Sequence, residues 1–470
     1  SRTGHVIDGQ QVDSGGEHID VVNPATGEVI AAVPAGTAAD VDAAVRAANN
    51  ALGAWSQTSV EERVGIIRRV VAELTGRREE MAATITAEMG SPITFSRNVQ
   101  ASLPIAITNS IAELLAGDFS FSEEIGNSLV LREPIGVVGC ITPWNYPLHQ
   151  IVAKVIPAVA AGNTVVLKPS EISPLTAGLF LAVLEAAGLP AGVVNLVHGT
   201  GPVVGEALSA HPGVDMISFT GSTRAGKLVT ASAAGTVKRV SLELGGKSAN
   251  VILDDADFTA AVKKGLANAF INGGQTCTAW TRMLVPADRH DEVVAMAAAG
   301  AAKYTIGDPT DENTRIGPMS SVAQRNRVLG YINKGIDEGA ELAFGGADTD
   351  GLPTPGAYVP VTVFGGVRPE MTIAQEEIFG PVLSILPYDT EDDAVEIANS
   401  TVYGLSGSVF AGDPERGLAV AKRIRTGQIS INGGSFNPVS PFGGYKQSGN
   451  GRELGKYGIE EFTELKSIQR

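Results

Sequence analysis

Cys277 is the residue of this sequence best suited to nucleophilic chemistry. The chain has two cysteines. Cys140 ends the apolar run 135–140 and is expected to be an inert small hydrophobe in a strand. Cys277 instead follows Gly, Gln and Thr in a short polar segment. A free thiol is only about 3% ionised at pH 7, so a catalytic role would need nearby donors or positive charge. Two cysteines exclude a disulfide framework and indicate a reducing compartment.

Two further positions could support a reaction at a carbonyl carbon. Asn145 lies in a turn between Pro143 and Pro147, which stiffen it and remove two backbone donors. Its amide could donate to a developing oxyanion, or Asn145 could be an ordinary turn residue or helix cap. Glu243 precedes two glycines, which let a ligand approach the backbone closely, so its carboxylate is a candidate general base.

Three other segments have the composition of a nucleotide site. In K-P-S-E, Glu171 could accept from a ribose 2′-hydroxyl and would repel a 2′-phosphate, or it could form a surface ion pair with Lys168. In 219–226 (FTGSTRAG), Ser222 at a helix start suits an anion site or a plain N-cap. The segment 198–205 (HGTGPVVG) is weaker evidence, because its last glycine is one place late for G-x-G-x-x-G.

Each of these segments follows a predicted strand. Between 134 and 254, β-rich runs alternate with helical patterns, which predicts βαβ units and a parallel sheet. Ligands bind at the carboxyl ends of such strands, so these residues should meet there. The expected strands are 135–140, 164–167, 193–197, 216–219 and 237–243, and the expected helices are 147–161, 174–187 with Ser173 as N-cap, 202–209 and 223–233.

The flanking parts also read as α/β structure. Apolar spacing predicts a helix over 38–54, with Asp40 as its cap, and an amphipathic helix over 59–89. A second α/β segment is expected from 254 to about 446. The tail 460–468 reads as a strand.

Composition narrows the class of protein. The chain has 470 residues, enough for two or three domains, and 35 Lys and Arg against 51 Asp and Glu give a net charge of −16. Such a balance argues against a nucleic-acid binder. The first twenty residues show no apolar core of a signal peptide, and no uncharged apolar run reaches membrane-spanning length. We therefore expect a cytoplasmic protein with no membrane partner.

The motifs together resemble the NAD(P)-dependent aldehyde dehydrogenase superfamily. P-W-N, K-P-S-E, F-T-G-S-T, E-L-G-G-K and G-Q-T-C occur in order, followed by E-E-I-F-G-P (376–381) and P-F-G-G-Y-K (441–446). The resemblance runs from about Asn23 to the C-terminus. It implies an α/β fold with a doubly wound parallel-sheet cofactor domain, an α/β catalytic domain and a small β oligomerisation arm. The implied limits are 1–115 with 134–245, then 246–445, and 116–133 with 446–470.

The resemblance also implies a reaction, the oxidation of an aldehyde to a carboxylic acid with NAD. Cys277 matches the family's nucleophile, which forms a thiohemiacetal and then a thioester. Asn145 matches the oxyanion donor, and Glu243 matches the base that activates the hydrolytic water. Lys154 matches a lysine that supports proton transfer. No metal is implied.

The implied cofactor is NAD, on the strength of Glu171, with NADP as an alternative. A small-molecule aldehyde and a homodimer or homotetramer are the implied partners. The implied cofactor-binding residues are Ile141, Trp144, Lys168, Ser170, Glu171, Gly201, Gly205, Phe219, Thr220, Gly221, Ser222, Leu244, Gln324, Glu377 and Phe379.

The implied substrate tunnel favours a medium, uncharged aldehyde, aliphatic or aromatic. Ala153 stands where many relatives carry a large aromatic residue, which would widen the tunnel, and Gln150 adds a polar edge. Two alternatives remain: a CoA-acylating aldehyde dehydrogenase, which generally lacks the glutamate base, and a catalytically silent dinucleotide-binding relative. The implied tunnel residues are Tyr146, Gln150, Ala153, Thr276, Thr278, Phe436 and Phe442.

Overall fold

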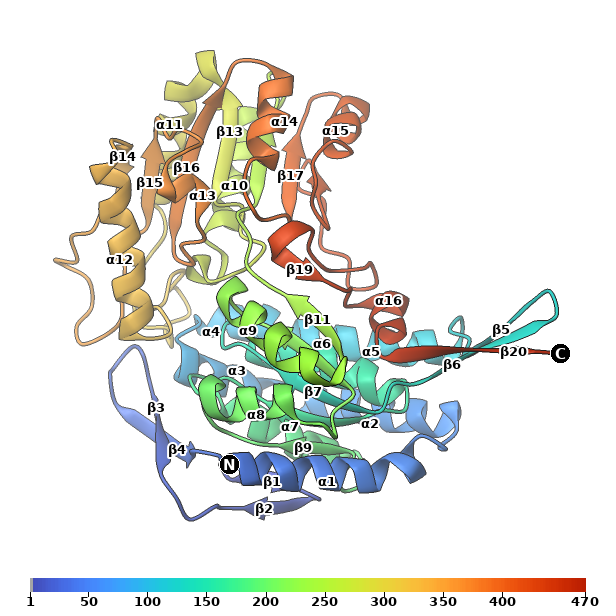
Figure 1. Cartoon of the computed structure of the whole chain (residues 1–470). Helices are drawn as coiled ribbons and strands as arrows, with labels where there is room; N and C mark the ends of the chain where they lie inside the picture. The colour runs from blue at the N-terminus through green and yellow to red at the C-terminus, as the bar shows by residue number, and fades with distance from the viewer. Residues whose placement is uncertain (1–2) are drawn as a thin grey trace.

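The computed structural model describes residues 3–470, in which two α/β lobes meet and a thin β arm projects from one of them (Figure 1). The first lobe holds the predicted parallel sheet, with β19, β2 and β1 as antiparallel additions at its edges. Five strands, from β11 across to β9, run parallel. The strand order is β19 (Gly449–Asn450), β11 (Arg239–Glu243), β10 (Met216–Thr220), β7 (Val137–Ile141), β8 (Thr164–Lys168), β9 (Val194–Leu196), β1 (His5–Ile7) and β2 (Gln10–Val12).

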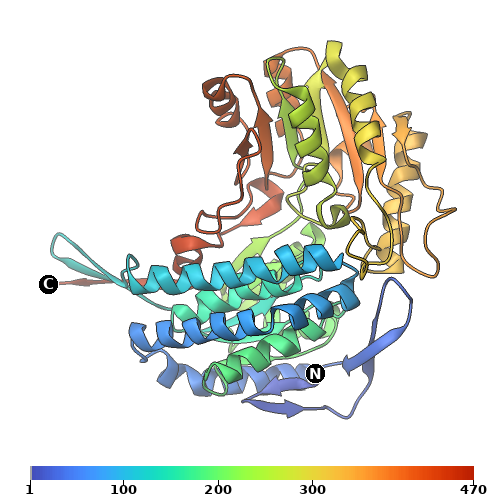
Figure 2. The same ribbon diagram turned by 180° about the vertical axis from the view of Figure 1, so that it is seen from behind.

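Alternation along the buried strands gives this sheet two apolar faces, each covered by helices. Val138 and Cys140 pack into a core with α2, α3, α5, α6 and α7, and Figure 2 shows a layer of long helices over that face. Val137 and Ile141 pack against α1, α8 and α9 on the opposite face. The doubly wound arrangement is confirmed, and Cys140 is buried in strand β7 as expected. The covering helices are α1 (Ala38–Trp55), α2 (Val60–Gly76), α3 (Arg78–Met89), α5 (Ser102–Ala116), α6 (Pro147–Ala160), α7 (Leu175–Ala186), α8 (Glu206–Ala210) and α9 (Thr223–Ala233).

The second lobe is built on a seven-stranded sheet that is parallel except at β14. One apolar core lies between this sheet and α10 and α11, and another lies between it and α12 to α15. The order is β14 (Glu341–Phe344), β15 (Thr362–Gly365), β16 (Val382–Tyr388), β13 (Arg282–Pro286), β12 (Ala249–Ile252), β17 (Gly407–Phe410) and β18 (Ser430–Ile431), with α10 (Phe258–Ala269), α11 (His290–Ala301), α12 (Val322–Asp337), α13 (Thr372–Gln375), α14 (Glu391–Asn399) and α15 (Pro414–Ala421).

The remaining elements are short. A separate hairpin precedes α1, and several 3₁₀ or π turns link the longer helices. They are β3 (His18–Val22), β4 (Val29–Pro34), α4 (Ile93–Phe95), η1 (Ser96–Gln100), η2 (Gly201–Gly205), η3 (Ala234–Thr236), η4 (Ile271–Gly274), η5 (Ala287–Arg289), η6 (Lys446–Ser448) and α16 (Gly455–Glu460).

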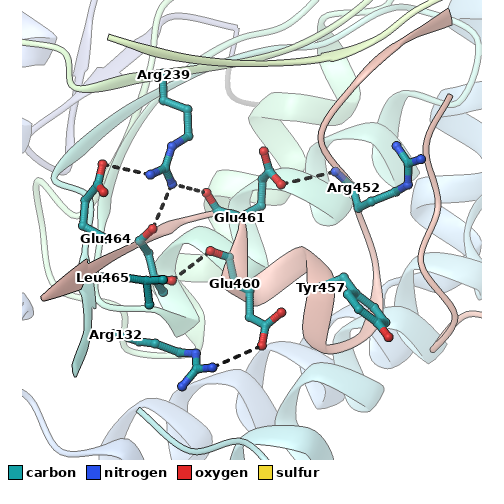
Figure 3. Close-up of a pocket in the computed structure, with 9 residues that line it drawn as sticks. Arg132, Arg239, Arg452, Tyr457, Glu460, Glu461, Glu464 and Leu465 are labelled. Atoms are coloured by element: carbon teal, nitrogen blue, oxygen red, sulfur yellow. Dashed lines mark hydrogen bonds and ion pairs between the residues drawn. The ribbon is translucent and has the colours of Figure 1, made fainter. Parts of the chain in front are cut away.

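The arm is a three-stranded antiparallel sheet of β20 (Thr463–Gln469), β6 (Ser128–Pro134) and β5 (Ser122–Ile125). Only Thr463–Gln469 of the expected arm segment 446–470 belongs to it, because Gly449–Asn450 pairs with β11 in the first sheet. A polar cavity of about 570 Å³ lies where the arm meets this lobe, and there an Arg239 nitrogen lies 2.9 Å from a Glu464 oxygen (Figure 3).

Four local predictions were wrong in detail. The N-cap of α1 is Thr37, and Asp40 is the third residue of a capping box, where its carboxylate accepts from the Thr37 N–H. The helical pattern over 59–89 is divided at Arg77, which leaves helical geometry. The expected helix 202–209 is the π turn η2 followed by α8, and the last strand begins at Arg239 because Val237 has a φ of 58°.

One helical stretch, Ile93–Ala116, is long and apolar enough to cross a membrane by length and composition, with a mean hydropathy of 1.2. It contains α4, η1 and α5 and includes the charged residues Arg97 and Glu113. Its apolar side chains Ile107 and Ile111 are buried in the core beside α2 and α6. We therefore interpret it as a core helix of the first lobe.

A buried carboxylate caps α7, which begins at Leu175 and not at Pro174. Glu88 of α3 accepts from the Leu175 N–H at 2.7 Å and from the Thr176 N–H at 3.1 Å. Ser173, the predicted cap, instead donates to the Trp144 carbonyl. Burial dominates over these hydrogen bonds and raises the pKa of Glu88 to about 7.

Glu88→Gln should therefore change the pH dependence of stability. Because the pKa of Glu88 is raised in the folded state, the folded protein binds this proton more tightly than the unfolded chain, and stability falls as pH rises from the ordinary value towards the raised one. Between about pH 5 and pH 8 the wild type should lose about 3 kcal/mol more free energy of unfolding than the variant. Urea denaturation at both pH values measures this, and equal losses would contradict it.

Candidate active site

A cavity of about 250 Å³ opens at the carboxyl ends of β7, β10 and β11, facing the second lobe. Fourteen residues line it, and eleven of them are predicted site residues. They come from both lobes, so the two sheets share one site. The lining residues are Pro143, Trp144, Asn145, Gln150, Thr220, Gly221, Ser222, Leu244, Gly245, Cys277, Gln324, Arg327, Glu377 and Phe379.

The loop that carries Cys277 depends on two glycines. After α10 the backbone passes through positive φ at Asn272 (52°), Gly273 (66°) and Gly274 (76°). A Cβ atom on Gly274 would lie 2.0 Å from the Gly380 carbonyl oxygen. A side chain at this position would therefore displace the loop. The thiol of Cys277 lies at the cavity, partly exposed to it.

Asn145 is joined directly to this loop. Its side-chain Nδ2 donates to the Gln275 carbonyl at 3.0 Å. The side chain is buried, and the amide group also lines the cavity beside Cys277. An amide nitrogen carries two hydrogens, so one remains available for an oxygen bound in the cavity. This geometry fits the predicted oxyanion donor.

The Cys277 thiol is electrostatically held in its neutral form. Burial, followed by the carboxylates Glu377, Glu243 and Glu453, raises the pKa of Cys277 well above its usual range. A neutral thiol resists oxidation and alkylation, because the thiolate is the reactive species. Activation therefore requires a proton acceptor or a positive charge that arrives with a ligand.

Glu243 is suited to be a general base. Its side chain is 4% exposed, and neither carboxylate oxygen has a hydrogen-bond partner among residues 3–470. Burial and the charge of Glu453 raise its pKa well above the ordinary value, and Lys154 and Arg452 oppose that rise. A carboxyl group with a raised pKa is a stronger base once ionised.

Lys154 forms a buried ion pair with Glu453. Both side chains are almost fully enclosed, and both charges act on Glu243. The structure thus places the predicted Lys154 beside the candidate base and not at the cavity wall. Glu453 was missed from the sequence, because nothing in its segment marks it as the partner of a lysine 299 positions away.

The second lobe contributes a carboxylate to the opposite wall. Glu377 accepts from the Gly246 N–H at 2.9 Å, and burial raises its pKa to about 7. A Cβ on Gly245 would lie 2.4 Å from a Glu377 oxygen, so the close approach requires glycine. Gln324 donates to the Phe379 carbonyl at 2.8 Å and holds that residue at a φ of 64°.

Aromatic rings and a helix N-terminus complete the wall. The Trp144 ring lies edge-to-face with Phe379, with 5.4 Å between centroids. Ser222 is the N-cap of α9 and accepts from the Ala225 N–H, and Gly221 and Ser222 line the cavity, so the N-terminus of α9 lies at its wall. Such a terminus favours an anion.

Lys168 and Glu171 form a pair beyond the cavity wall. Lys168 Nζ lies 3.1 Å from a Glu171 oxygen and also donates to the Pro169 carbonyl. Lys168 is 3% exposed, whereas the Glu171 side chain is 36% exposed. The carboxylate therefore remains accessible to a ligand.

The other predicted cofactor residues surround the same edge of the sheet. The register of β7 and β8 places Ile141 beside Lys168, and that of β10 and β11 places Thr220 beside Glu243. Gly201 and Gly205 bound the turn η2. Thr220, Gly221 and Leu244 line the cavity, whereas Ile141, Ser170 and Phe219 are buried outside its lining.

Most of the predicted substrate residues lie outside the cavity lining. Gln150 alone lines the cavity. The Tyr146 hydroxyl is hydrogen-bonded to Thr276 Oγ1 at 2.8 Å, and Ala153 is buried in α6. Thr278 is half-buried. The exposed Phe436 lies edge-to-face with Phe442, with 6.5 Å between centroids.

Three cavity residues were not predicted. Pro143 and Gly245 lie in motifs that contain predicted site residues, so those neighbouring residues could have indicated them. Arg327 lies one helical turn after Gln324 in α12 and donates to the Glu377 carbonyl at 2.8 Å. Its spacing from Gln324 could have indicated it.

Comparison with known proteins identifies the family. The family model described as "Aldehyde dehydrogenase family" matches residues 11–468. The chain belongs to the aldehyde dehydrogenase family. A 3-succinoylsemialdehyde-pyridine dehydrogenase of a Pseudomonas species is 49% identical over 469 residues, which cover 98% of this chain and 97% of that protein.

Solved aldehyde dehydrogenases share this fold. A mutant of aldehyde dehydrogenase C of Pseudomonas syringae, in complex with NAD+ and octanal, is similar with a TM-score of 0.98 and 52% identity, covering 100% of this chain and 96% of that one. An aldehyde dehydrogenase of Mycobacterium tuberculosis in complex with NAD+ gives 0.97 and 44%, covering 100% and 98%.

Alkylation of the purified protein by iodoacetamide should show the raised pKa of Cys277 directly. Because burial and three carboxylates raise this pKa, we expect the alkylation rate to keep rising beyond about pH 9, without the plateau of an activated thiolate. Cys277→Ser should abolish the labelling and Cys140→Ser should not change it, since Cys140 is fully buried. A plateau below about pH 8 would contradict the raised pKa.

Proposed function

We propose that this chain oxidises a medium, uncharged aldehyde to the carboxylic acid, with NAD as hydride acceptor and Cys277 as nucleophile. The observation that carries the proposal is that Cys277 and Asn145 line one cavity between the lobes, and that the buried Glu243, outside the cavity lining, is near enough for its charge to act on the Cys277 thiol. Nucleophile, oxyanion donor and base are the three groups that acyl chemistry on a thiol requires.

The residues present fit a dinucleotide cofactor. Two carboxylates, Glu171 and Glu377, can accept from ribose hydroxyls, and the N-terminus of α9 at Ser222 can receive a phosphate. Glycines at 221 and 245 leave the wall without side chains, where a Cβ would lie about 2.5 Å from Phe219 and 2.4 Å from Glu377. Two similar solved enzymes are complexes with NAD+.

The first half of the reaction forms a bond to sulfur. The thiol proton passes to solvent, and the Cys277 sulfur attacks the carbonyl carbon. The electron pair of the C=O bond moves to oxygen, where the free Asn145 N–H and the backbone N–H of Cys277 stabilise it. NAD, when bound, accepts the hydride that this thiohemiacetal oxyanion expels.

The second half frees the thiol. Cys277 now carries a thioester, and Glu243 removes a proton from water as the water oxygen attacks the acyl carbon. The C–S bond breaks, the acid leaves and the sulfur recovers a proton. The charges of the buried Lys154–Glu453 ion pair both act on the pKa of Glu243, and we assign Lys154 a supporting role in this proton transfer.

The substrate class rests on the tunnel residues and on two relatives. The cavity lining includes one cation, Arg327, which is hydrogen-bonded to the Glu377 carbonyl. Gln150, Trp144 and Phe379 present polar but uncharged or aromatic surface. The similar enzymes are a complex with octanal and a 3-succinoylsemialdehyde-pyridine dehydrogenase, and these names supply one straight-chain aldehyde and one aldehyde whose chain carries a pyridine ring. EC 1.2.1.3 is the class that we propose.

We further propose that the chain is cytoplasmic and forms a homodimer or homotetramer through its arm. The outer strands β5 and β20 each leave one edge without a strand partner within the described chain, and exposed Ile125, Leu465 and Ile468 lie on them. We keep the predicted domain limits as part of this proposal, except that the arm segment after 446 is shortened to Thr463–Gln469.

Glu171→Gln should shift cofactor preference towards NADP. Removing the accessible carboxylate beside Lys168 removes repulsion of a 2′-phosphate and an acceptor for the 2′-hydroxyl. We expect the ratio of kcat/KM with NADP to that with NAD to rise about tenfold. Asp118→Asn, an exposed residue with the same charge change, is the control. An unchanged ratio would show that Glu171 does not contact the ribose of the cofactor.

The function itself is tested by NADH formation across an aldehyde panel. We expect activity with octanal and with aromatic aldehydes without added CoA, loss of activity in Cys277→Ala, and a kcat roughly 10²–10³-fold lower in Asn145→Ala. Activity only in the presence of CoA would assign the chain to the acylating class. An inactive wild type that still binds NAD would reduce the function to dinucleotide binding.

A further inference from the structure

Gln100 occupies an unusual place beside the site. It is the last residue of the π-helical turn η1, which joins α4 to α5 through the wide hydrogen bond from the Ala101 N–H to the Ser96 carbonyl. The side chain is 0% exposed. A π turn inserts an extra residue into a helix and redirects the side chains around it, and such turns are frequent at functional sites.

The Gln100 amide nitrogen is the donor of a small network. Nε2 donates to the backbone carbonyl of Asn145 at 3.0 Å and to Asn272 Oδ1 at 3.4 Å. Asn272 Nδ2 donates to the same Asn145 carbonyl at 2.9 Å. With the bond from Asn145 Nδ2 to the Gln275 carbonyl, three side-chain amides join η1, the turn after β7 and the Cys277 loop.

Packing alone does not account for a glutamine here. Its Oε1 is buried and has no hydrogen-bond partner among the described residues, which costs about 1–3 kcal/mol. Methionine, of similar length and without polar atoms, would avoid that cost. Among the described residues only the Nε2 group of Gln100 is used, and it donates to the Asn145 carbonyl, to Asn272 Oδ1 and, at 3.4 Å, to the sulfur of Met89.

We propose that Gln100 is a positioning residue that holds the backbone of Asn145 and thereby aims the Asn145 amide. The inference rests on the proposed function, since it takes Asn145 as the oxyanion donor. Gln100 does not line the cavity and does not touch the reacting atoms. Its effect is transmitted through the Asn145 backbone, so removing Gln100 should matter only while Asn145 has its side chain.

The test uses p-nitrophenyl acetate as a probe of acylation without cofactor. Attack of the Cys277 sulfur on the ester carbon breaks the bond to p-nitrophenolate, which leaves with the electron pair, and an acetyl thioester remains. The burst rate constant would be measured in the full chain for the wild type, Gln100→Met, Asn145→Ala and the double variant. Thr108→Val is the control, because Thr108 is buried and bonded only within its own helix.

We expect Gln100→Met to slow the burst about tenfold in the wild-type background and less than about twofold in the Asn145→Ala background. The dissociation constant for NAD should be unchanged. Gln100→Glu, which aims oxygen atoms at the Asn145 and Asn272 oxygens, should slow the burst more than Gln100→Met. If either variant fails to fold, the other still shows whether Gln100 acts as a hydrogen-bond donor or only fills space.

Equal slowing in both backgrounds would overturn the proposal, because Gln100 would then act independently of Asn145. An unchanged burst in Gln100→Met would overturn it as well. The proposed function fails separately, if the wild type gives a burst with the ester but forms no NADH from any aldehyde. A wild type without any burst at Cys277 would overturn both.

Discussion

The hydrogen bond from the Asn145 amide to the Gln275 carbonyl joins the two lobes at the point where chemistry is expected. Asn145 follows β7 of the first sheet, and Gln275 precedes Cys277 in a loop of the second lobe. A hydrogen bond is directional, so this contact constrains how the Asn145 amide lies relative to the loop that carries Cys277. On the Cys277 side, this hydrogen bond follows the glycine-dependent turn at 272–274. On the other side, Asn145 lies between two prolines, Pro143 and Pro147.

The electrostatics of the site follow from the enclosure that this contact requires. Burial raises the pKa of Cys277, Glu243 and Glu377, so the resting site favours neutral groups over three charges in a small volume. We therefore expect these groups to become charged only when a cofactor and an aldehyde are bound. Of the buried ion pair beside Glu243, Glu453 adds to the rise of the Glu243 pKa and Lys154 opposes it.

Much of this was predictable from the sequence, because polar motifs at the ends of apolar strands must meet at one edge of a parallel sheet. Asn145, Glu243 and the 219–222 segment were located this way, and Cys277 stood out by its polar neighbours. Local rules failed where a distant residue supplied the interaction. Glu88 caps α7 from another helix, and no propensity at Ser173 could show that.

The missed parts of the site share that cause. Glu453 pairs with Lys154 across 299 positions, and Gln100 reaches Asn145 only because a π turn redirects it. No motif in the segment S-R-N-V-Q-A-S marks Gln100 as part of the site. Side-chain networks of this kind depend on the packing of three elements, which hydrophobic periodicity does not encode. The domain limits and the role of each residue remain predictions of the same family resemblance.

The central claim is that an acyl group resides on Cys277 during turnover. Octanal and NAD would be mixed with Glu243→Gln, the reaction quenched in acid, and the digested peptides weighed by mass spectrometry. We expect an octanoyl group on the Cys277 peptide that accumulates in this variant, is short-lived in the wild type and is absent from Cys277→Ala. NADH formation without any adduct on Cys277, or with the adduct on another residue, would contradict covalent catalysis by this thiol.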